Sequence, residues 1–136
     1  MKILIVEDEI HNQRLLTGMI SEIRPSWNVV EVIDSVADSV EWLSQNEIDL
    51  IFMDIQLVDG TCFSIFDKRT IQSPVIFTTA FDTYALQAFK VNSIDYLLKP
   101  IKEAIMVCLP LGTLSNLKEP SFLVIVPILV PFIKTL

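Results

Sequence analysis

Short apolar runs alternate along residues 1–100 with stretches in which apolar side chains recur every three or four positions. Such runs are typical of strands buried on both faces of a parallel sheet, and the three-to-four spacing forms one face of a helix. Because parallel neighbours need crossover connections that cover both faces, the alternation predicts an α/β fold with a doubly wound five-stranded parallel sheet. The predicted strands are 3–6, 29–33, 50–53, 75–78 and 95–98, and the predicted helices are 12–23, 37–45, a weaker one from the turn at 59–60 to about 68, and 84–89.

Polar side chains follow the predicted strands at their carboxyl ends, which is where open α/β sheets bind ligands. They are Glu7, Asp8 and Glu9 after the first strand, Asp54 after the third, Thr78 and Thr79 after the fourth, and Lys99 with Pro100 after the fifth. Carboxylates held close together repel one another unless a cation neutralises them. We therefore expect Glu7, Asp8 and Asp54 to surround a hard divalent cation, Mg²⁺ or Mn²⁺.

Two further side chains at this edge suit a phosphoryl group. Lys99 brings a positive charge and Thr79 a hydroxyl donor, and with the cation they would disperse the charge of a transferring phosphoryl group. Asp54 stands alone at the tip of a buried strand, a rigid position for a carboxylate nucleophile that forms an acyl phosphate. The plain alternative is a set of solvated charges at strand ends, which the combination of residue types disfavours.

Composition and charge narrow the functional classes. The 136 residues fit one domain, and 51% of them are hydrophobic. The net charge of the whole chain is −7, and that of residues 1–100 alone is −8. The electrostatic field of this negative charge repels the phosphate backbone of nucleic acids, so we expect no direct binding of nucleic acid by this chain. Cys62 and Cys108 match no metal or redox spacing and are expected to be semi-buried thiols. The amino terminus reaches acidic residues too early for a signal peptide, which indicates a cytoplasmic protein.

The pattern changes after about residue 102. Pro110 stops any helix begun near Ile101 after roughly two turns, and the apolar stretch 122–133 contains Pro127 and Pro131. That stretch is shorter than the ~20 residues of a membrane helix, so we expect no membrane association. We divide the chain into a core at 1–102 and an atypical apolar segment at 103–136, which is either an altered last helix or non-native tail, or a strand that pairs with another copy.

Four segments resemble the signatures of response-regulator receiver domains, in the right order and spacing: VEDE at 6–9, MDIQLVDG at 53–60, TTA at 78–80 and DYLLKPI at 95–101. The resemblance covers roughly residues 1–102 and is specific as a set. It implies a flavodoxin-like, CheY-like fold and a role in two-component signal transduction, with a phosphoryl group passing from a sensor histidine kinase to the receiver. It also implies a switch rather than an enzyme with a separate substrate.

The resemblance assigns a role to each matching residue. Asp54 is the phosphoacceptor, Thr79 and Lys99 bind the phosphoryl oxygens, Asp8 is a direct metal ligand, Glu7 is a ligand through water, and the backbone carbonyl of Gln56 is the third protein contact to the metal. It further implies a cis bond before Pro100, a switch in which Tyr96 moves inward with Thr79, and dimerisation through the face of the fourth helix and fifth strand. Glu7 departs from the aspartate more usual in the family.

The stretch 77–101 and the short loop 54–60 are similar to receivers that precede a LytTR-type DNA-binding domain. We expect this chain to be the receiver part of a longer transcription regulator, because residues 103–136 are too few for such a domain. Phe81, two residues beyond Thr79, is expected to act with Gln56 as a gate that hinders water from attacking the phosphorylated Asp54. The single histidine, His11, is expected to be a surface helix residue, although a phosphohistidine is conceivable.

Three other functions are alternatives to a phosphorylated switch. An aspartate-nucleophile phosphatase would normally carry a second aspartate two residues after the first, where this chain has Gln56. A flavin or nucleotide module needs a first loop that cradles phosphate, whereas Glu7, Asp8 and Glu9 would repel one. A stand-alone signalling or binding module is the third. The sequence favours the phosphorylated switch.

Overall fold

The computed structural model describes residues 1–80 and 93–101, with the backbone alone for 93–96. Within these residues the chain forms a five-stranded parallel sheet in the order β2-β1-β3-β6-β7. The strands are β1 (Lys2–Val6), β2 (Asn28–Ile33), β3 (Leu50–Asp54), β6 (Val75–Thr79) and β7 (Ser93–Leu98). This arrangement confirms the doubly wound parallel sheet that the sequence predicts.

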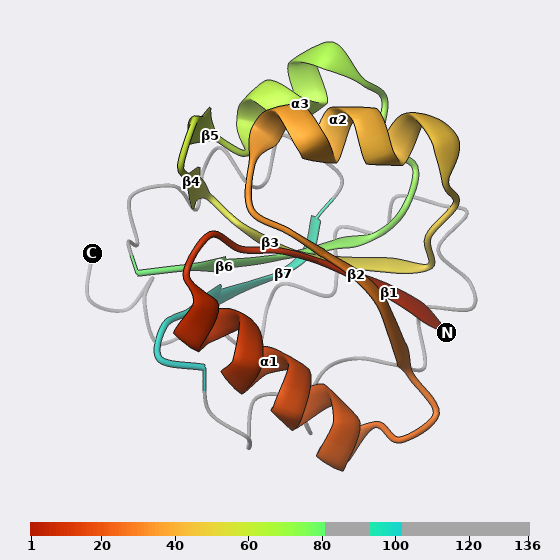
Figure 1. The fold of residues 1–136 in the computed structure, drawn as a ribbon, viewed down its shortest axis with the longest axis vertical. Coiled ribbons are helices and arrows are strands. Elements are labelled where there is room, and N and C mark those ends of the chain that lie inside the picture. Colours follow the sequence, from red (N-terminus) through yellow and green to blue (C-terminus); the bar gives the residue numbers. More distant parts are fainter. Residues whose placement is uncertain (81–92, 102–136) are drawn as a thin grey trace.

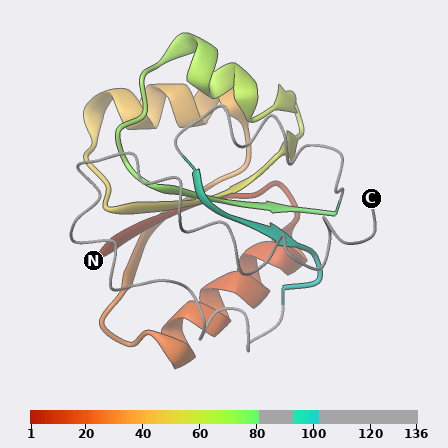
Figure 2. The ribbon, with the colours of Figure 1, turned by 180° about the vertical axis from the view of Figure 1, so that it is seen from behind.

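Helices cover both faces of the sheet. Helix α1 (Ile10–Ile23) packs on one face, and α2 (Val36–Gln45) and α3 (Phe63–Lys68) pack on the other (Figures 1 and 2). Helix α1 begins two residues earlier than the apolar pattern predicts, because Ile10 is exposed and adds nothing to that pattern. The predicted helix at 84–89 and the segment at 103–136 lie outside the described residues.

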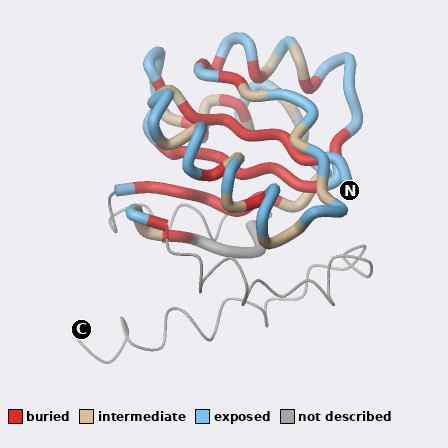
Figure 3. Tube along the Cα trace, turned by 60° about the horizontal axis from the view of Figure 1, so that its bottom comes forward, coloured by how far each residue is buried: buried red, intermediate tan, exposed pale blue. Residues whose placement is uncertain are grey.

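Two apolar clusters explain why the central strands are uninterrupted apolar runs. Along β1, Ile3 and Ile5 pack toward α1, whereas Leu4 and Val6 belong to the cluster beneath α2 and α3. All five residues of β3 are buried, as the tube in Figure 3 shows for the centre of the sheet. Asp54 ends this strand, so its backbone is held by packing on both faces.

A small hairpin follows β3. It consists of β4 (Gln56–Leu57) and β5 (Gly60–Thr61), which pair antiparallel. Gly60 has φ 143°, a conformation that residues with a side chain rarely adopt, so the turn depends on glycine at this position. The sequence predicted a turn at 59–60 but no strands, because two-residue strands leave no periodic pattern.

Strand β2 lies at one edge of the described sheet, where it pairs with β1 alone. Most of its side chains are exposed or half-buried, including Val30 and Glu31, and the pairing register shifts between Ile3 and Leu4. Among the described residues there is no helix long and apolar enough to cross a membrane.

Candidate metal and phosphoryl-transfer site

The carboxyl ends of β1 and β3 bring three acidic side chains together. Ligand oxygens of Glu7, Asp8 and Asp54 all lie within 4.8 Å of one another. Glu7 is 2% exposed and Asp54 6% exposed, whereas Asp8 is half-buried. Three carboxylates this close, two of them buried, need a positive charge among them.

Lys99 supplies that charge from the end of β7. Its Nζ lies 2.7 Å from Glu7 Oε2 and 2.8 Å from Asp54 Oδ2, and its side chain is only 15% exposed. One ammonium group therefore bridges the acid at the end of β1 and the acid at the end of β3. The sequence placed Lys99 near a phosphoryl group but did not predict this double ion pair.

Burial and hydrogen bonding shift the pKa values of both Glu7 and Lys99. The pKa of Glu7 is raised, chiefly because burial disfavours its charged form, and this outweighs the hydrogen bonds that it accepts from Lys99 and from the Glu9 N–H at 3.0 Å. Burial alone would lower the pKa of Lys99, but its hydrogen bonds to Asp54 and Glu7 raise it above its usual value. The lysine therefore stays charged and the site is held together by that charge.

Backbone hydrogen bonds fix the position of Asp54. The N–H of Ile55 donates to the carbonyl of Thr78 at 3.3 Å, which keeps β3 paired with β6 up to its end. The N–H of Gln56 donates to Asp54 Oδ1 at 3.2 Å, so one carboxylate oxygen faces the loop and the other faces Lys99. The side chain is thus oriented before any ligand arrives.

Thr79 and Lys99 meet through the backbone at the same edge. Thr79 is fully buried at the end of β6, and its carbonyl accepts a hydrogen bond from the Lys99 N–H at 2.7 Å. The Lys99–Pro100 peptide bond is cis. A surface cavity of about 550 Å³ opens over these residues, and Asp8, Asp54, Gln56, Thr79 and Lys99 line it together with His11.

The donor set fits a hard divalent cation. Carboxylate oxygens are the ligands that Mg²⁺ prefers, and Mg²⁺ keeps several waters beside one or two carboxylates. Asp8 and Asp54 both line the cavity, while Glu7 is more deeply buried and already holds Lys99. Asp8 and Asp54 would therefore hold the ion directly, and Glu7 would contact it only through a water molecule.

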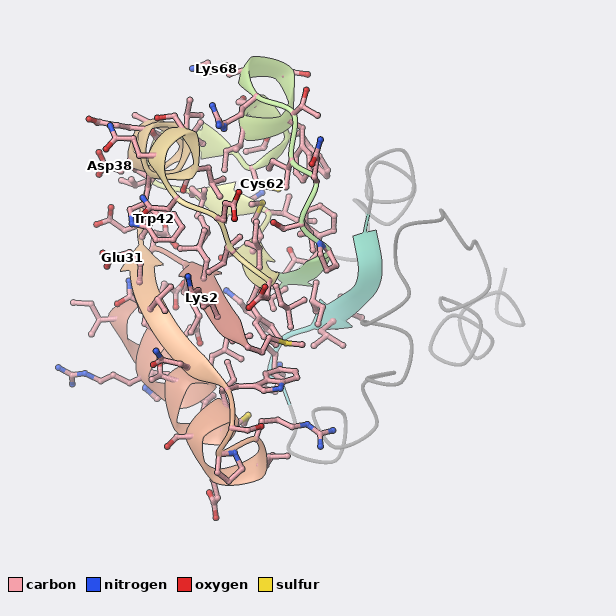
Figure 4. All side chains as sticks on the ribbon, turned by 90° about the vertical axis from the view of Figure 1, so that its right-hand side faces the viewer. Lys2, Glu31, Asp38, Trp42, Cys62 and Lys68 are labelled. Atoms are coloured by element: carbon pink, nitrogen blue, oxygen red, sulfur yellow. The ribbon has the colours of Figure 1, made fainter. Side chains whose placement is uncertain are left out.

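Two predicted residues are not placed by the structure. Phe81 and the side chain of Tyr96 lie outside what is described, so the gate and the aromatic switch stay predictions. Cys108 is also outside. Cys62 is described, and it is fully buried rather than semi-buried, inside the body of the domain where Figure 4 labels it.

The sequence missed the part played by Asp59. Its carboxylate oxygens accept hydrogen bonds from the N–H groups of Val36, at 2.7 Å, and Ala37, at 3.1 Å, the first residues of α2. The hydrogen bond from Val36 is the main reason why the pKa of Asp59 is lowered. The sequence shows only an aspartate in a predicted turn. Nothing in it indicates that this aspartate binds the start of a helix more than twenty residues away.

A parallel sheet ordered in this way, with three acids and a lysine at one edge, defines the class of receiver domains. The family model for the response regulator receiver domain matches residues 3–108, and the chain belongs to this family. It is a family of regulatory domains, not of conventional enzymes. This confirms the fold and the family that the sequence indicates.

Individual relatives point to one branch of that family. The chain is 41% identical over 106 residues to the sensory transduction protein LytT of Enterococcus faecalis, covering 76% of this chain and 43% of that protein. It is 37% identical over 103 residues to the transcriptional regulatory protein LytR of Staphylococcus aureus, covering 74% of this chain and 42% of that protein. The chain thus spans less than half the length of these relatives.

A solved structure supports the same assignment. The response regulatory domain of mrkE from Klebsiella pneumoniae is 30% identical, with a TM-score of 0.70, and the match covers 86% of this chain and 94% of that one. The similarity to a solved response regulatory domain, nearly all of which is matched, agrees with the assignment of this chain as a receiver domain.

Proposed function

We propose that Asp54 accepts a phosphoryl group from a phosphohistidine of a sensor histidine kinase. The observation that carries the proposal is the placement of Asp54 itself, at the end of a fully buried strand, with one oxygen held by Gln56 and the other 2.8 Å from Lys99. An oxygen of Asp54 forms the new bond to phosphorus as the bond from phosphorus to the histidine nitrogen breaks. The histidine ring retains the electron pair of that bond.

Asp8, Asp54 and the backbone carbonyl of Gln56 would hold a divalent cation, Mg²⁺ or Mn²⁺, and Glu7 would contribute through water. When bound, such an ion neutralises negative charge on the phosphoryl oxygens. Lys99 would contribute the same effect from β7, moving from its carboxylate partners to a phosphoryl oxygen. The hydroxyl of Thr79 would donate a hydrogen bond to another of these oxygens.

Phosphorylation would then act as a switch. Drawing Thr79 toward the phosphoryl group would let Tyr96 move inward and alter the face of the fourth helix and fifth strand, where two copies would dimerise. The names of the relatives and their length support an output through a LytTR-type DNA-binding domain in a longer cytoplasmic transcription regulator. The receiver itself would not bind DNA.

Intact mass spectrometry tests the central step. The chain is incubated with acetyl phosphate, with and without Mg²⁺, beside Asp54→Ala and the control Asp67→Ala, which removes an exposed aspartate of α3. We expect the mass of one phosphoryl group to be added to the unmodified chain and to the control, only when Mg²⁺ is present. A folded chain that gains no mass, or Asp54→Ala that still gains it, would refute the proposal.

The proposed gate has a test of its own. If Phe81 and Gln56 hinder the attacking water, Phe81→Asn and Phe81→Glu will both lose the phosphoryl group faster than the unmodified chain. For Phe81→Glu we expect an increase of about tenfold or more, because a carboxylate can act as a general base on the water. The decay is followed by intact mass after removal of acetyl phosphate. Equal rates would show that Phe81 is no barrier.

A further inference from the structure

Asp59 joins the hairpin after the phosphoacceptor strand to the start of α2. Its Oδ1 and Oδ2 accept from the N–H groups of Val36 and Ala37, at 2.7 and 3.1 Å. Backbone N–H groups in the first turn of a helix have no carbonyl partner within the helix. The carboxylate satisfies two of them, and both of its oxygens are engaged in doing so.

Asp59 and the proposed metal ligand Gln56 belong to the same short hairpin. Gln56 pairs with Thr61 and Leu57 with Gly60, which leaves only Val58 and Asp59 in the turn. The N–H of Gln56 also donates to Asp54 Oδ1. Because the two paired strands are joined by this two-residue turn, an anchor on Asp59 restrains the hairpin that contains the Gln56 backbone.

The segment that Asp59 binds is also tied to the first acidic loop. The carbonyl of Ile33, at the end of β2, accepts a hydrogen bond from the Glu7 N–H at 2.8 Å. The short stretch from Ile33 to Ala37 therefore connects the Glu7 backbone on one side with the Asp59 carboxylate on the other. This path of hydrogen bonds links the two loops that carry the proposed metal ligands.

We infer that Asp59 is a positioning residue for the divalent cation, holding the hairpin so that the Gln56 carbonyl stays at a fixed place relative to Asp8 and Asp54. The inference rests on the proposed metal site. Mg²⁺ demands near-ideal octahedral geometry, so a ligand on a loosened loop contributes less to its affinity. Asp59 is not a ligand in this inference, because both of its carboxylate oxygens accept hydrogen bonds from the start of α2.

Asp59 could instead act only as a cap that stabilises α2. A variant of Ser35 distinguishes this capping role from the positioning role. The Ser35 hydroxyl oxygen accepts from the Asp38 N–H at 3.2 Å, so it caps the same helix through a hydrogen bond that does not involve Asp59. Ser35→Ala removes a cap of α2 and leaves the hairpin anchored. Asp59→Ala removes a cap and releases the hairpin.

Isothermal titration of the full chain with MgCl₂ alone provides the test, on the unmodified protein, Asp59→Ala, Asp59→Asn and Ser35→Ala. We expect Asp59→Ala to weaken Mg²⁺ binding on the order of tenfold, the scale on which outer-shell partners act. Asp59→Asn keeps one acceptor oxygen, so its affinity for Mg²⁺ should lie between those of the unmodified chain and Asp59→Ala. Ser35→Ala should bind Mg²⁺ with the affinity of the unmodified chain. Circular dichroism checks folding, and if Asp59→Ala does not fold, Asp59→Asn decides.

The outcomes separate the inference from the function beneath it. Unchanged binding by the folded Asp59 variants would overturn the positioning role. An equal loss in Ser35→Ala would overturn it as well, because the effect would then follow from weakening α2. Failure of the unmodified chain to bind Mg²⁺ would instead refute the proposed metal site.

Discussion

The ammonium group of Lys99 lies 2.7 Å from Glu7 Oε2, and the Glu7 side chain is only 3% exposed. Lys99 also lines the cavity, together with Asp8 and Asp54, so its ammonium group lies between the buried Glu7 carboxylate and the open part of the site. The single ammonium group offsets part of the negative charge of the three carboxylates, and it does so at the two that are buried.

Glu7 should make stability depend on pH in metal-free buffer. Its pKa is raised above the ordinary value of 4.5 by burial, so the folded protein holds the proton more tightly than the unfolded chain does. This contribution is fully present below pH 4.5 and is lost as pH rises through the raised pKa. The unfolding free energy of the unmodified chain minus that of Glu7→Gln should therefore fall as pH rises from 4.5 through the raised pKa of Glu7. Urea denaturation in EDTA measures it, and a constant difference would contradict it.

Removing Lys99 should make the fold depend on divalent cation. Lys99→Met leaves Glu7 and Asp54 buried without the ammonium group that bridges them, which costs about 3 kcal/mol at neutral pH. Mg²⁺ should then raise the melting temperature of Lys99→Met more than that of the unmodified chain. Lys2→Met, at an exposed position, serves as the control. Equal shifts on adding Mg²⁺ would argue against compensation by Lys99.

Thr79→Ala should separate phosphorylation from switching. Thr79 is fully buried at the end of β6, and the proposed function gives its hydroxyl the task of following the phosphoryl group. The variant should still gain one phosphoryl mass but lose the phosphorylation-dependent change in amide hydrogen exchange over residues 81–101. Thr78→Ala removes another buried hydroxyl from the same strand and should keep that change. A normal response by Thr79→Ala would remove Thr79 from the switch.

Cys62 should be chemically silent in the folded protein. The thiol is fully buried, and burial followed by the negative charge of Asp54 raises its pKa far above the usual value. Since the thiolate is the reactive form, a Cys108→Ser variant should not react with an aromatic disulfide reagent until urea unfolds it. Rapid labelling in native buffer would show that the region around α3 opens readily.

The strand positions and the site they carry could be predicted because one physical signal fixes both. A run buried on both faces must be apolar to its end, so the first polar residue after it marks the edge where ligands bind. Asp54 and Lys99 were found in this way, and the structure brings their side chains to 2.8 Å. Glu7 was found too, but its burial and its pairing with Lys99 depend on side-chain conformations that no pattern encodes.

What could not be predicted rests on contacts between distant segments. The hydrogen bonds of Asp59 join residues 22 and 23 positions apart, and the hairpin that holds Asp59 has strands of two residues each. Neither leaves a periodic signal. The early start of α1 at Ile10 was missed for a related reason, because an exposed apolar residue carries no information about the buried face.

Strand β2 has a consequence for how copies of this chain behave when crowded. Its outer edge presents backbone groups, but Glu31 and Val30 are exposed along it and the register with β1 is broken once. Glu31 and Asp38 lie on the same side of the molecule in Figure 4, and both line a groove with Trp42. Two such edges approaching each other would bring like charges together and find no straight ladder to extend. Copies of this chain at high concentration would therefore not add to one another through β2 to form an extended sheet or a fibril.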